Sequence, residues 1–177
     1  MRKDPGAYEL TAPQMEKLTR LAILEPGREP KVNREFIGKN PSVIARAIGL
    51  DLSDDIRVLW AEVPNDHPFV MSEQLMPVLP VTVVKDIDAA IELAYLAEGE
   101  NHHSAGMYST DVRNMTKMGR RMACSIFVKN GCTLHALGLG EGYASMSIGT
   151  PTGDGITKTS HFVRPLQCSM VGYLRIA

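Results

Sequence analysis

The stretch VTVVKDIDAAIELAYLAEGENHHSAGMYSTDVRNMTKMGRRMACSIFV, residues Val81–Val128, decides the fold. Three short runs within it have the composition of β-strands: Val81–Val84, Ser104–Tyr108 and Cys124–Val128. A helical pattern separates each pair of neighbouring runs. The order β-α-β-α-β is typical of an α/β protein whose parallel strands are joined by right-handed crossovers.

Both helices in this stretch carry recognisable end signals. Asp86 caps the first helix, which runs to about Glu98 and stops at Gly99. The second helix occupies Thr110–Met122. Apolar residues at helical spacing predict which side chains face inward. They are Ile87, Ala90, Ile91 and Ala94 in the first helix and Val112, Met115, Met118 and Met122 in the second.

The residues before this stretch predict two more helices and a strand. Thr11 caps a helix with Pro13 in its first turn, and Asn40 with Pro41 begins another that ends at Gly49. Their inward residues are predicted to be Met15, Leu18, Leu21 and Ala22, and then Val43, Ile44 and Ile48. A polar connection, Glu25–Arg34, joins the two helices, and Ile56–Glu62 reads as a strand.

The residues after this stretch have a different texture. Residues 130 to 155 contain seven glycines and few periodic apolar residues, which predicts one long loop or several short ones. Gly138, Gly140 and Gly142 lack the GxGxxG order of a dinucleotide-binding turn and indicate a structural loop. The alternating tail Gln167–Ile176 is expected to form a final strand.

Composition excludes several classes of protein. At 177 residues, with 44% hydrophobic and 22% charged residues, the chain is typical of one globular domain. A net charge of −1 argues against a nucleic-acid partner. No apolar run approaches the ~20 residues that cross a bilayer, and residues 1–20 hold no secretory signal, so we expect no membrane partner. Three cysteines without CxxC spacing indicate a reducing compartment.

The segment HPFVMSEQLMPVLPV, His67–Val81, holds the first candidate site residue. It places the single acid Glu73 between apolar residues and the bracket formed by Pro77 and Pro80. A carboxylate amid apolar surface is costly to desolvate unless something hydrogen-bonds it. Glu73 is therefore either an exposed loop acid or the anchor of a ligand.

This segment resembles the cofactor-facing motif of the aldehyde dehydrogenase superfamily, and further motifs are similar to its CoA-acylating branch in ethanolamine and propanediol utilisation. These are FIGKNPSVIARAIG at Phe36–Gly49, SIFVKNG at Ser125–Gly131, GLGEGY at Gly138–Tyr143, TPTGDGIT at Thr150–Thr157 and FVRPLQCSMVGYLRI at Phe162–Ile176. The similarity runs from about Tyr8 to the end of the chain. It covers only the C-terminal part of the much longer family members.

The resemblance implies a fold and a reaction. Residues 1–160 would be part of a three-layer, Rossmann-like catalytic domain of the aldehyde dehydrogenase fold, and residues 161–177 a C-terminal oligomerisation strand. The parent enzymes convert a short aldehyde, coenzyme A and NAD to acyl-CoA and NADH. By the same resemblance, Glu73 binds the nicotinamide ribose and Leu75 flanks the nicotinamide ring.

None of the three cysteines matches the family's nucleophile, which lies upstream of the matched segment. Cys124 and Cys168 are expected to be buried fillers, and Cys132 is the cysteine with plausible exposure. We therefore assign no catalytic residue and expect the chain alone to be inactive. It is then an excised piece, one half of a split enzyme with a complementing N-terminal chain, a non-enzymatic assembly module that forms homo-oligomers through its last strand, or a nucleotide-binding regulatory domain.

Other polar residues invite weaker interpretations. His67, His102, His103, His135 and His161 are scattered without ligand spacing, so no metal site is predicted. We expect His103 to hydrogen-bond backbone near the acyl pocket. Lys129, Arg120 and Arg121 either meet the phosphates of coenzyme A or, for the two arginines, simply complement the helix dipole. The expected location is the cytoplasm, with a bacterial microcompartment as the alternative.

Overall fold

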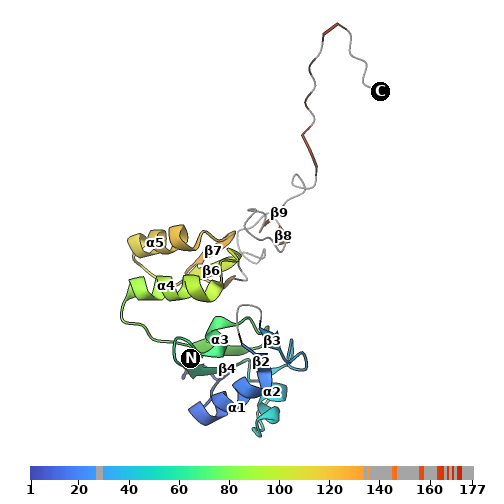
Figure 1. Ribbon diagram of the computed structural model, residues 1–177, viewed down its shortest axis with the longest axis vertical. Coiled ribbons are helices and arrows are strands. Elements are labelled where there is room, and N and C mark those ends of the chain that lie inside the picture. Colours follow the sequence, from blue (N-terminus) through green and yellow to red (C-terminus); the bar gives the residue numbers. More distant parts are fainter. Residues whose placement is uncertain are drawn as a thin grey trace. The chain divides into compact units, whose positions relative to one another are not determined.

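The computed structural model describes most of the chain (Figure 1). The chain forms two compact units, Met1–Glu100 and Asn101–Ala177. The described residues are 1–26, 30–133, 135, 145–146, 156–157, 163–165, 167, 169 and 171–172. None of the described helices has the length and apolar character that spanning a bilayer requires. The division predicted at residues 160 and 161 stays a prediction.

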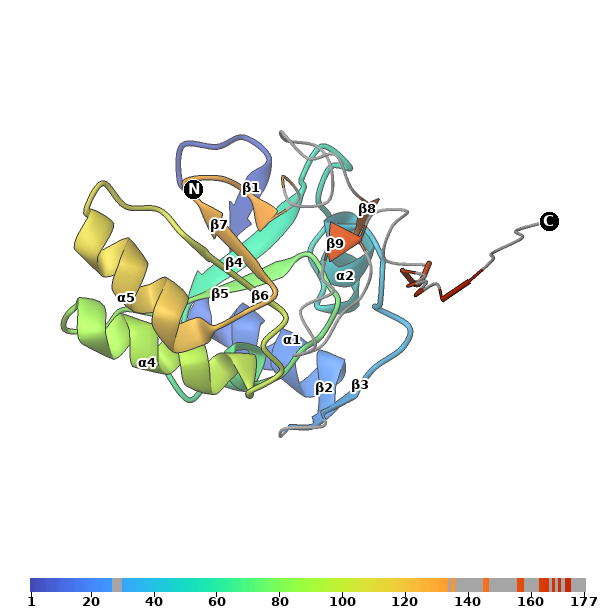
Figure 2. The same ribbon diagram turned by 90° about the horizontal axis from the view of Figure 1, so that it is seen from above.

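A parallel three-stranded sheet organises the first unit. Its strands are β1 (Ala7–Glu9), β4 (Val58–Glu62) and β5 (Val78–Val81), in the order β1-β4-β5 (Figure 2). The central strand β4 pairs with both neighbours. Three of its five residues are buried, as expected for a strand covered on its faces.

Two helices, α1 (Ala12–Ala22) and α2 (Pro41–Ala47), pack apolar side chains into the first core. Both begin where the sequence predicts, after Thr11 and after Asn40. At the first cap, the side chain of Gln14 accepts a hydrogen bond of 2.8 Å from the backbone N–H of Thr11. The side chains with no exposed surface are Leu18, Ala22, Ile44, Ala45 and Leu59.

Two predicted core residues are wrong. Leu21 is 37% exposed and Val43 is 41% exposed. In α1 the buried row follows the i, i+3, i+7 spacing through Met15, Leu18 and Ala22. In α2 the buried residues centre on Ile44. A neighbouring residue on a helix is turned by about 100° from this row, which places its side chain at the edge of the core.

The predicted polar connection between these helices contains a short hairpin. β2 (Ile23–Glu25) and β3 (Lys31–Val32) pair antiparallel. Lys31 Nζ lies 2.9 Å from Glu25 Oε1, and the backbone N–H of Asn33 donates to the carbonyl of Ala22 at 2.8 Å. The hairpin fixes the return of the chain toward α2.

β5 begins three residues before the predicted strand Val81–Val84. The ladder with β4 sets this register: Leu59 N–H donates to the Pro77 carbonyl at 2.9 Å, and Val63 N–H donates to the Val81 carbonyl at 2.8 Å. Pro80 lies between the residues of β5 that bond to β4, so the N–H that proline lacks removes no hydrogen bond from this ladder.

A buried tryptophan lies on β4. Trp60 is 6% exposed, with the guanidinium carbon of Arg2 at 5.7 Å from its ring centroid. Arg2 also makes two 2.8 Å hydrogen bonds to Glu9, which hold the pKa of that carboxyl below its ordinary value. Within the described part of the chain, the indole Nε1 of Trp60 has no hydrogen-bond acceptor.

Beyond β5 the first unit ends in α4 (Ile87–Glu98). Its cap is the predicted one: Asp86 accepts from Ala89 N–H at 2.8 Å, and Gly99 ends the helix at φ 70°. Ile91 is buried at 2% exposure. The other predicted inward residues, Ile87, Ala90 and Ala94, are only half-buried.

The second unit is built on β6 (Ser104–Met107) and β7 (Ile126–Lys129), a parallel pair joined through α5 (Val112–Met122). With β5 and α4 this completes the predicted β-α-β-α-β order. Asn130 ties the two strand ends together: its Oδ1 accepts from Ser109 N–H at 2.7 Å and its Nδ2 donates to the Ser109 carbonyl at 2.8 Å.

Three details of this unit differ from the predictions. Val112 is 68% exposed, because the buried row of α5 runs through Met115, Met118 and Met122 instead. Cys124 lies before β7 and not in it, since Ala123 turns the chain with a left-handed φ of 47°. The region predicted as loop contributes β8 (Ser145–Met146), which pairs with β9 (Ile156–Thr157).

Removing the cap of α5 should measurably destabilise the chain. Asp111 Oδ1 accepts from the backbone N–H groups of Arg113 at 2.8 Å and Asn114 at 3.3 Å. We expect Asp111→Ala to lower the free energy of unfolding by about 1 kcal/mol in urea denaturation. Asp111→Asn is the matched control, because asparagine caps as well as aspartate. Equal losses in the two variants would contradict this role.

Candidate functional site

The loop between α3 (Pro68–Met71) and β5 carries the two residues predicted to bind cofactor. Glu73 is exposed, and among the described residues its carboxylate makes no hydrogen bond or ion pair. Leu75, two residues further on, is 64% exposed. The structure therefore brings the predicted pair together and presents both side chains outward.

Leu75 adopts a backbone conformation that leucine rarely takes. Its φ is 52°, in the left-handed region, which costs an L-residue about 1–2 kcal/mol. Its carbonyl accepts a 3.2 Å hydrogen bond from the backbone N–H of Gly38, itself at φ 68°. Gln74 Nε2 donates to the Val78 carbonyl at 3.1 Å. These bonds hold the strained turn from its downstream side.

His67 holds the same loop from its upstream side. It is the N-cap of α3, and its Nδ1 accepts a hydrogen bond of 3.2 Å from Phe69 N–H. Its Nε2 lies 3.3 Å from Thr19 Oγ1 on α1, and its ring stacks on Phe69 with centroids 5.9 Å apart. Burial lowers the pKa of His67, against a smaller opposing effect of Asp66. The sequence analysis missed this role, although histidine directly before a proline at N1 was a usable signal.

The described histidines and carboxylates form no cluster that could hold a metal ion. His102 Nδ1 lies 2.7 Å from the Met122 carbonyl. His103 Nδ1 lies 2.6 Å from Ser104 Oγ, and its expected hydrogen bond to backbone stays a prediction. His161 lies outside the described residues.

The two described cysteines lie in the second unit and are free thiols. Cys124 is partly buried, with its Sγ 3.7 Å from the Met122 carbonyl, as suits a filler. Cys132 is exposed, as predicted. Cys168 and the glycines Gly138, Gly140 and Gly142 lie outside the described residues, so their interpretation stays a prediction.

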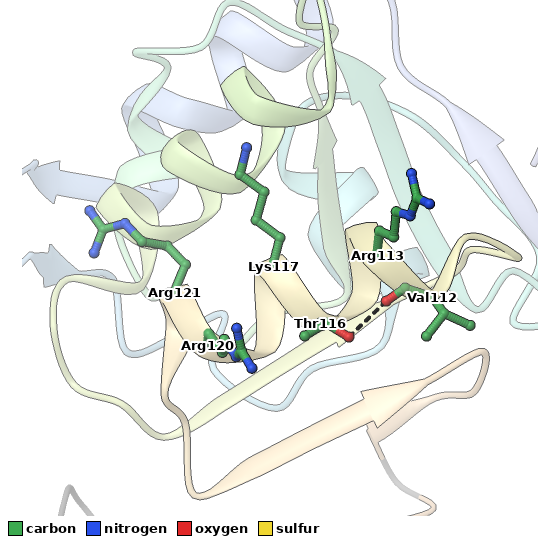
Figure 3. A pocket seen from close by; sticks show the side chains of 6 residues that line it. All are labelled: Val112, Arg113, Thr116, Lys117, Arg120 and Arg121. Atoms are coloured by element: carbon green, nitrogen blue, oxygen red, sulfur yellow. Dashed lines mark hydrogen bonds between the residues drawn. The ribbon is translucent and has the colours of Figure 1, made fainter.

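Four basic residues share one face of α5. Arg120 and Arg121 lie in its last turn, where they complement the helix dipole. Arg113 and Lys117 extend the charge toward the first turn, and with Val112 and Thr116 the four line a shallow hollow (Figure 3). Thr116 Oγ1 donates to the Val112 carbonyl at 2.8 Å and so does not project its hydrogen into the hollow. Lys129 is exposed at the end of β7.

Comparisons with known proteins point to one class. The acetylating acetaldehyde dehydrogenase EutE of Salmonella typhimurium is 43% identical over 173 residues, which cover 96% of this chain and 37% of the relative. No family model matches the chain.

Solved structures agree. Propionaldehyde dehydrogenase of Rhodopseudomonas palustris with bound propionyl-CoA is 40% identical with a TM-score of 0.84, covering 93% of this chain and 36% of that one. An engineered glycolyl-CoA reductase with bound NADP⁺ is 39% identical with a TM-score of 0.83, covering 93% and 37%. Propionaldehyde dehydrogenase from the Clostridium phytofermentans fucose utilisation microcompartment is 34% identical with a TM-score of 0.86, covering 96% and 38%.

The parallel α/β architecture and these structures define the class, a segment of the aldehyde dehydrogenase fold, which confirms the predicted fold class. Within it, the chain is a homologue of part of the CoA-acylating aldehyde dehydrogenases, as the motifs predict. It spans a little over a third, 37%, of the length of the curated relatives it matches.

Proposed function

We propose that this chain supplies the nicotinamide-facing part of the catalytic domain to an enzyme that converts a short aldehyde, CoA and NAD or NADP to acyl-CoA and reduced cofactor. One observation carries the proposal. Glu73 is an exposed carboxylate with no intramolecular partner among the described residues, on a loop held at both sides, in a chain 43% identical to an acetylating aldehyde dehydrogenase.

The chemistry of the loop fits a dinucleotide. An ionised carboxylate only accepts hydrogen bonds. The two hydroxyls of a ribose can each donate a hydrogen bond to such a carboxylate. A bound nicotinamide cofactor accepts the hydride in this class of reaction. Glu73 would fix the ribose, and Leu75 would flank the ring with an apolar surface smaller than an aromatic side chain. The resulting room suits a cofactor that must leave before CoA attacks.

The basic face of α5 and Lys129 are the groups we propose for CoA. Arg120 and Arg121 belong to a row of four cations, which offers more positive charge than a helix end needs for its dipole. Arginine matches the geometry of phosphate oxygens particularly well. The solved propionaldehyde dehydrogenase of Rhodopseudomonas palustris holds propionyl-CoA, which supports CoA as the second substrate.

The nucleophile, the cofactor-binding domain and the assembly are further parts of the proposal. A cysteine thiolate and the Rossmann-type domain would come from the rest of the enzyme or from a complementing chain. Residues 161–177 would pair with a second copy to form a homo-oligomer. We propose the bacterial cytoplasm as the location, with a microcompartment suggested by the relative from the Clostridium phytofermentans fucose utilisation compartment.

A second candidate is an assembly module that keeps the oligomerisation strand and performs no chemistry. Co-purification separates the two. A partner chain that carries a nucleophilic cysteine supports the split enzyme, whereas a homo-oligomer without such a partner supports the module. Titration with NAD also excludes a free-standing regulatory domain if binding by the lone chain is weak.

Glu73→Gln tests the cofactor site. In an enzyme completed by replacing the matching segment of EutE with this chain, the substitution should raise the dissociation constant of NAD by about 10- to 150-fold. This is the equivalent of about 1.5–3 kcal/mol for hydrogen bonds to a charged group. Isothermal calorimetry measures the constant directly.

Asp51→Asn is the matched control for this test. Asp51 is an exposed acid after α2, and the substitution makes the same change from carboxylate to amide away from the loop. It should leave the dissociation constant unchanged. An unchanged constant in Glu73→Gln, with the chimera active, would show that Glu73 is a surface acid only.

A further inference from the structure

We propose that His67 is a positioning residue for the turn that carries Glu73 and Leu75, and that only its neutral imidazole does this work. The proposal rests on the proposed function of Glu73 for its biological meaning. It stands structurally on three contacts of one ring: to Phe69 N–H, to Thr19 on α1 and to the face of Phe69.

The hydrogen bonds determine the form of the imidazole. Nδ1 accepts from Phe69 N–H at 3.2 Å, so it carries no proton. A neutral ring then carries its proton on Nε2, which lies 3.3 Å from Thr19 Oγ1. Thr19 Oγ1 can accept it, because its own hydrogen points to the Met15 carbonyl at 2.7 Å. One arrangement of protons therefore gives every group in this series of hydrogen bonds, from Phe69 N–H to the Met15 carbonyl, a partner.

Protonation destroys this arrangement at its first link. An imidazolium ion has two N–H donors and no acceptor, so Nδ1 would meet the Phe69 N–H as donor against donor. The Thr19 contact survives, since Nε2 still donates. A lower pH therefore breaks the hydrogen bond that caps α3 and leaves the hydrogen bond to Thr19 on α1 in place.

The cap matters because α3 is a single turn that leads directly into the site. α3 ends at Met71, and Glu73 follows after Ser72. Phe69 is 3% exposed and anchors the turn in the core. Downstream, the loop is held by the bond from Gly38 to Leu75. When the cap is lost, the segment 68–75 loses one of the hydrogen bonds that hold its upstream end.

The charged groups around the ring set the direction of its titration. Burial lowers the pKa of His67, and the carboxylate of Asp66 raises it by less. On α1, Glu16 and Arg20 flank Thr19 and pair with each other. α3 also packs on α4, where the acids Asp88 and Glu92 are exposed, and on β5, which has no titratable side chain.

The lowered pKa fixes the sign of the pH effect. A histidine whose folded-state pKa lies below its unfolded value stabilises the fold fully above the unfolded value of about 6.5. This contribution is lost as the pH falls through the lower folded value. The turn that carries Glu73 should therefore be ordered at neutral pH and loosen in mild acid.

Amide hydrogen exchange of the 177-residue chain tests the proposal without any cofactor. Protection factors, which correct for the intrinsic pH dependence of exchange, should fall about fivefold for residues 68–75 between neutral and mildly acidic buffer. His67→Asn keeps a cap acceptor that does not titrate, so its protection should be the same at both pH values. His135→Asn, an exposed histidine of the second unit, should respond as the unchanged chain does.

Two outcomes would overturn the proposal: equal protection of residues 68–75 at both pH values in the unchanged chain, or the same fall in His67→Asn. Because this readout needs no NAD, it is independent of the cofactor test. A pH step that depends on His67, with Glu73→Gln neutral for NAD, would uphold the positioning role and reject the proposed cofactor site. Equal protection at both pH values, with a raised dissociation constant for NAD in Glu73→Gln, would reject the positioning role and uphold the proposed cofactor site.

Discussion

The 177-residue chain, purified alone, should produce no NADH from acetaldehyde, CoA and NAD above the rate of a protein-free blank. The chemistry needs a cysteine thiolate in an activating setting. Cys124 is partly buried with its thiol at the Met122 carbonyl, and Cys132 is exposed after β7 with no role suggested by the resemblance. Absorbance of NADH measures the outcome.

The matching positive experiment supplies the nucleophile that our proposal assigns to the rest of the enzyme. Co-expression with the preceding part of EutE, which carries the nucleophile in our proposal, should raise NADH production from the blank level to a readily measured rate. Cys132→Ser is the control in both experiments and should change neither. Turnover by the lone chain that disappears in Cys132→Ser would identify Cys132 as a nucleophile and reject the proposed division of labour.

Leu59→Ala should cost about 2–5 kcal/mol of unfolding free energy, a large part of the about 5–15 kcal/mol that typical domains have. Leu59 lies on the central strand β4 with no exposed surface, among the side chains of the first core. Its truncation removes buried methyl groups and leaves a cavity that a sheet paired on both sides closes poorly.

Guanidinium denaturation followed by circular dichroism measures this loss. Leu79→Ala is the control, because Leu79 lies on the adjacent strand β5 but is 45% exposed. Its truncation should cost less than about 1 kcal/mol, as is usual for surface positions. Similar losses in the two variants would show that β4 is not the centre of a cooperative core.

The elements predicted most accurately are those whose signals are local. The caps at Thr11, Asp86 and Gly99 lie where the sequence places them, because a cap depends on a few neighbouring residues. The start of β5 was wrong for the opposite reason. Its position depends on hydrogen bonds to β4, some twenty residues away, which no local pattern around Pro80 encodes.

The candidate site shows the same division. The motif around Glu73 was sufficient to find an exposed carboxylate, because the resemblance marks one position. The left-handed turn at Leu75 and the contact between His67 and Thr19 were not predicted. The first depends on a bond from Gly38, and the second joins residues 48 positions apart. Support of a site by distant residues becomes visible only when the chain is folded.

The burial of Trp60 beneath Arg2 has a practical consequence for spectroscopy. The chain has one tryptophan, and it belongs to the first unit. Its fluorescence should therefore shift to longer wavelength when that unit melts and stay silent when only the second unit does. The heat capacity recorded over the same temperatures reports the unfolding of both units. A calorimetric peak that has no counterpart in the emission would reveal that residues 101–177 come apart on their own.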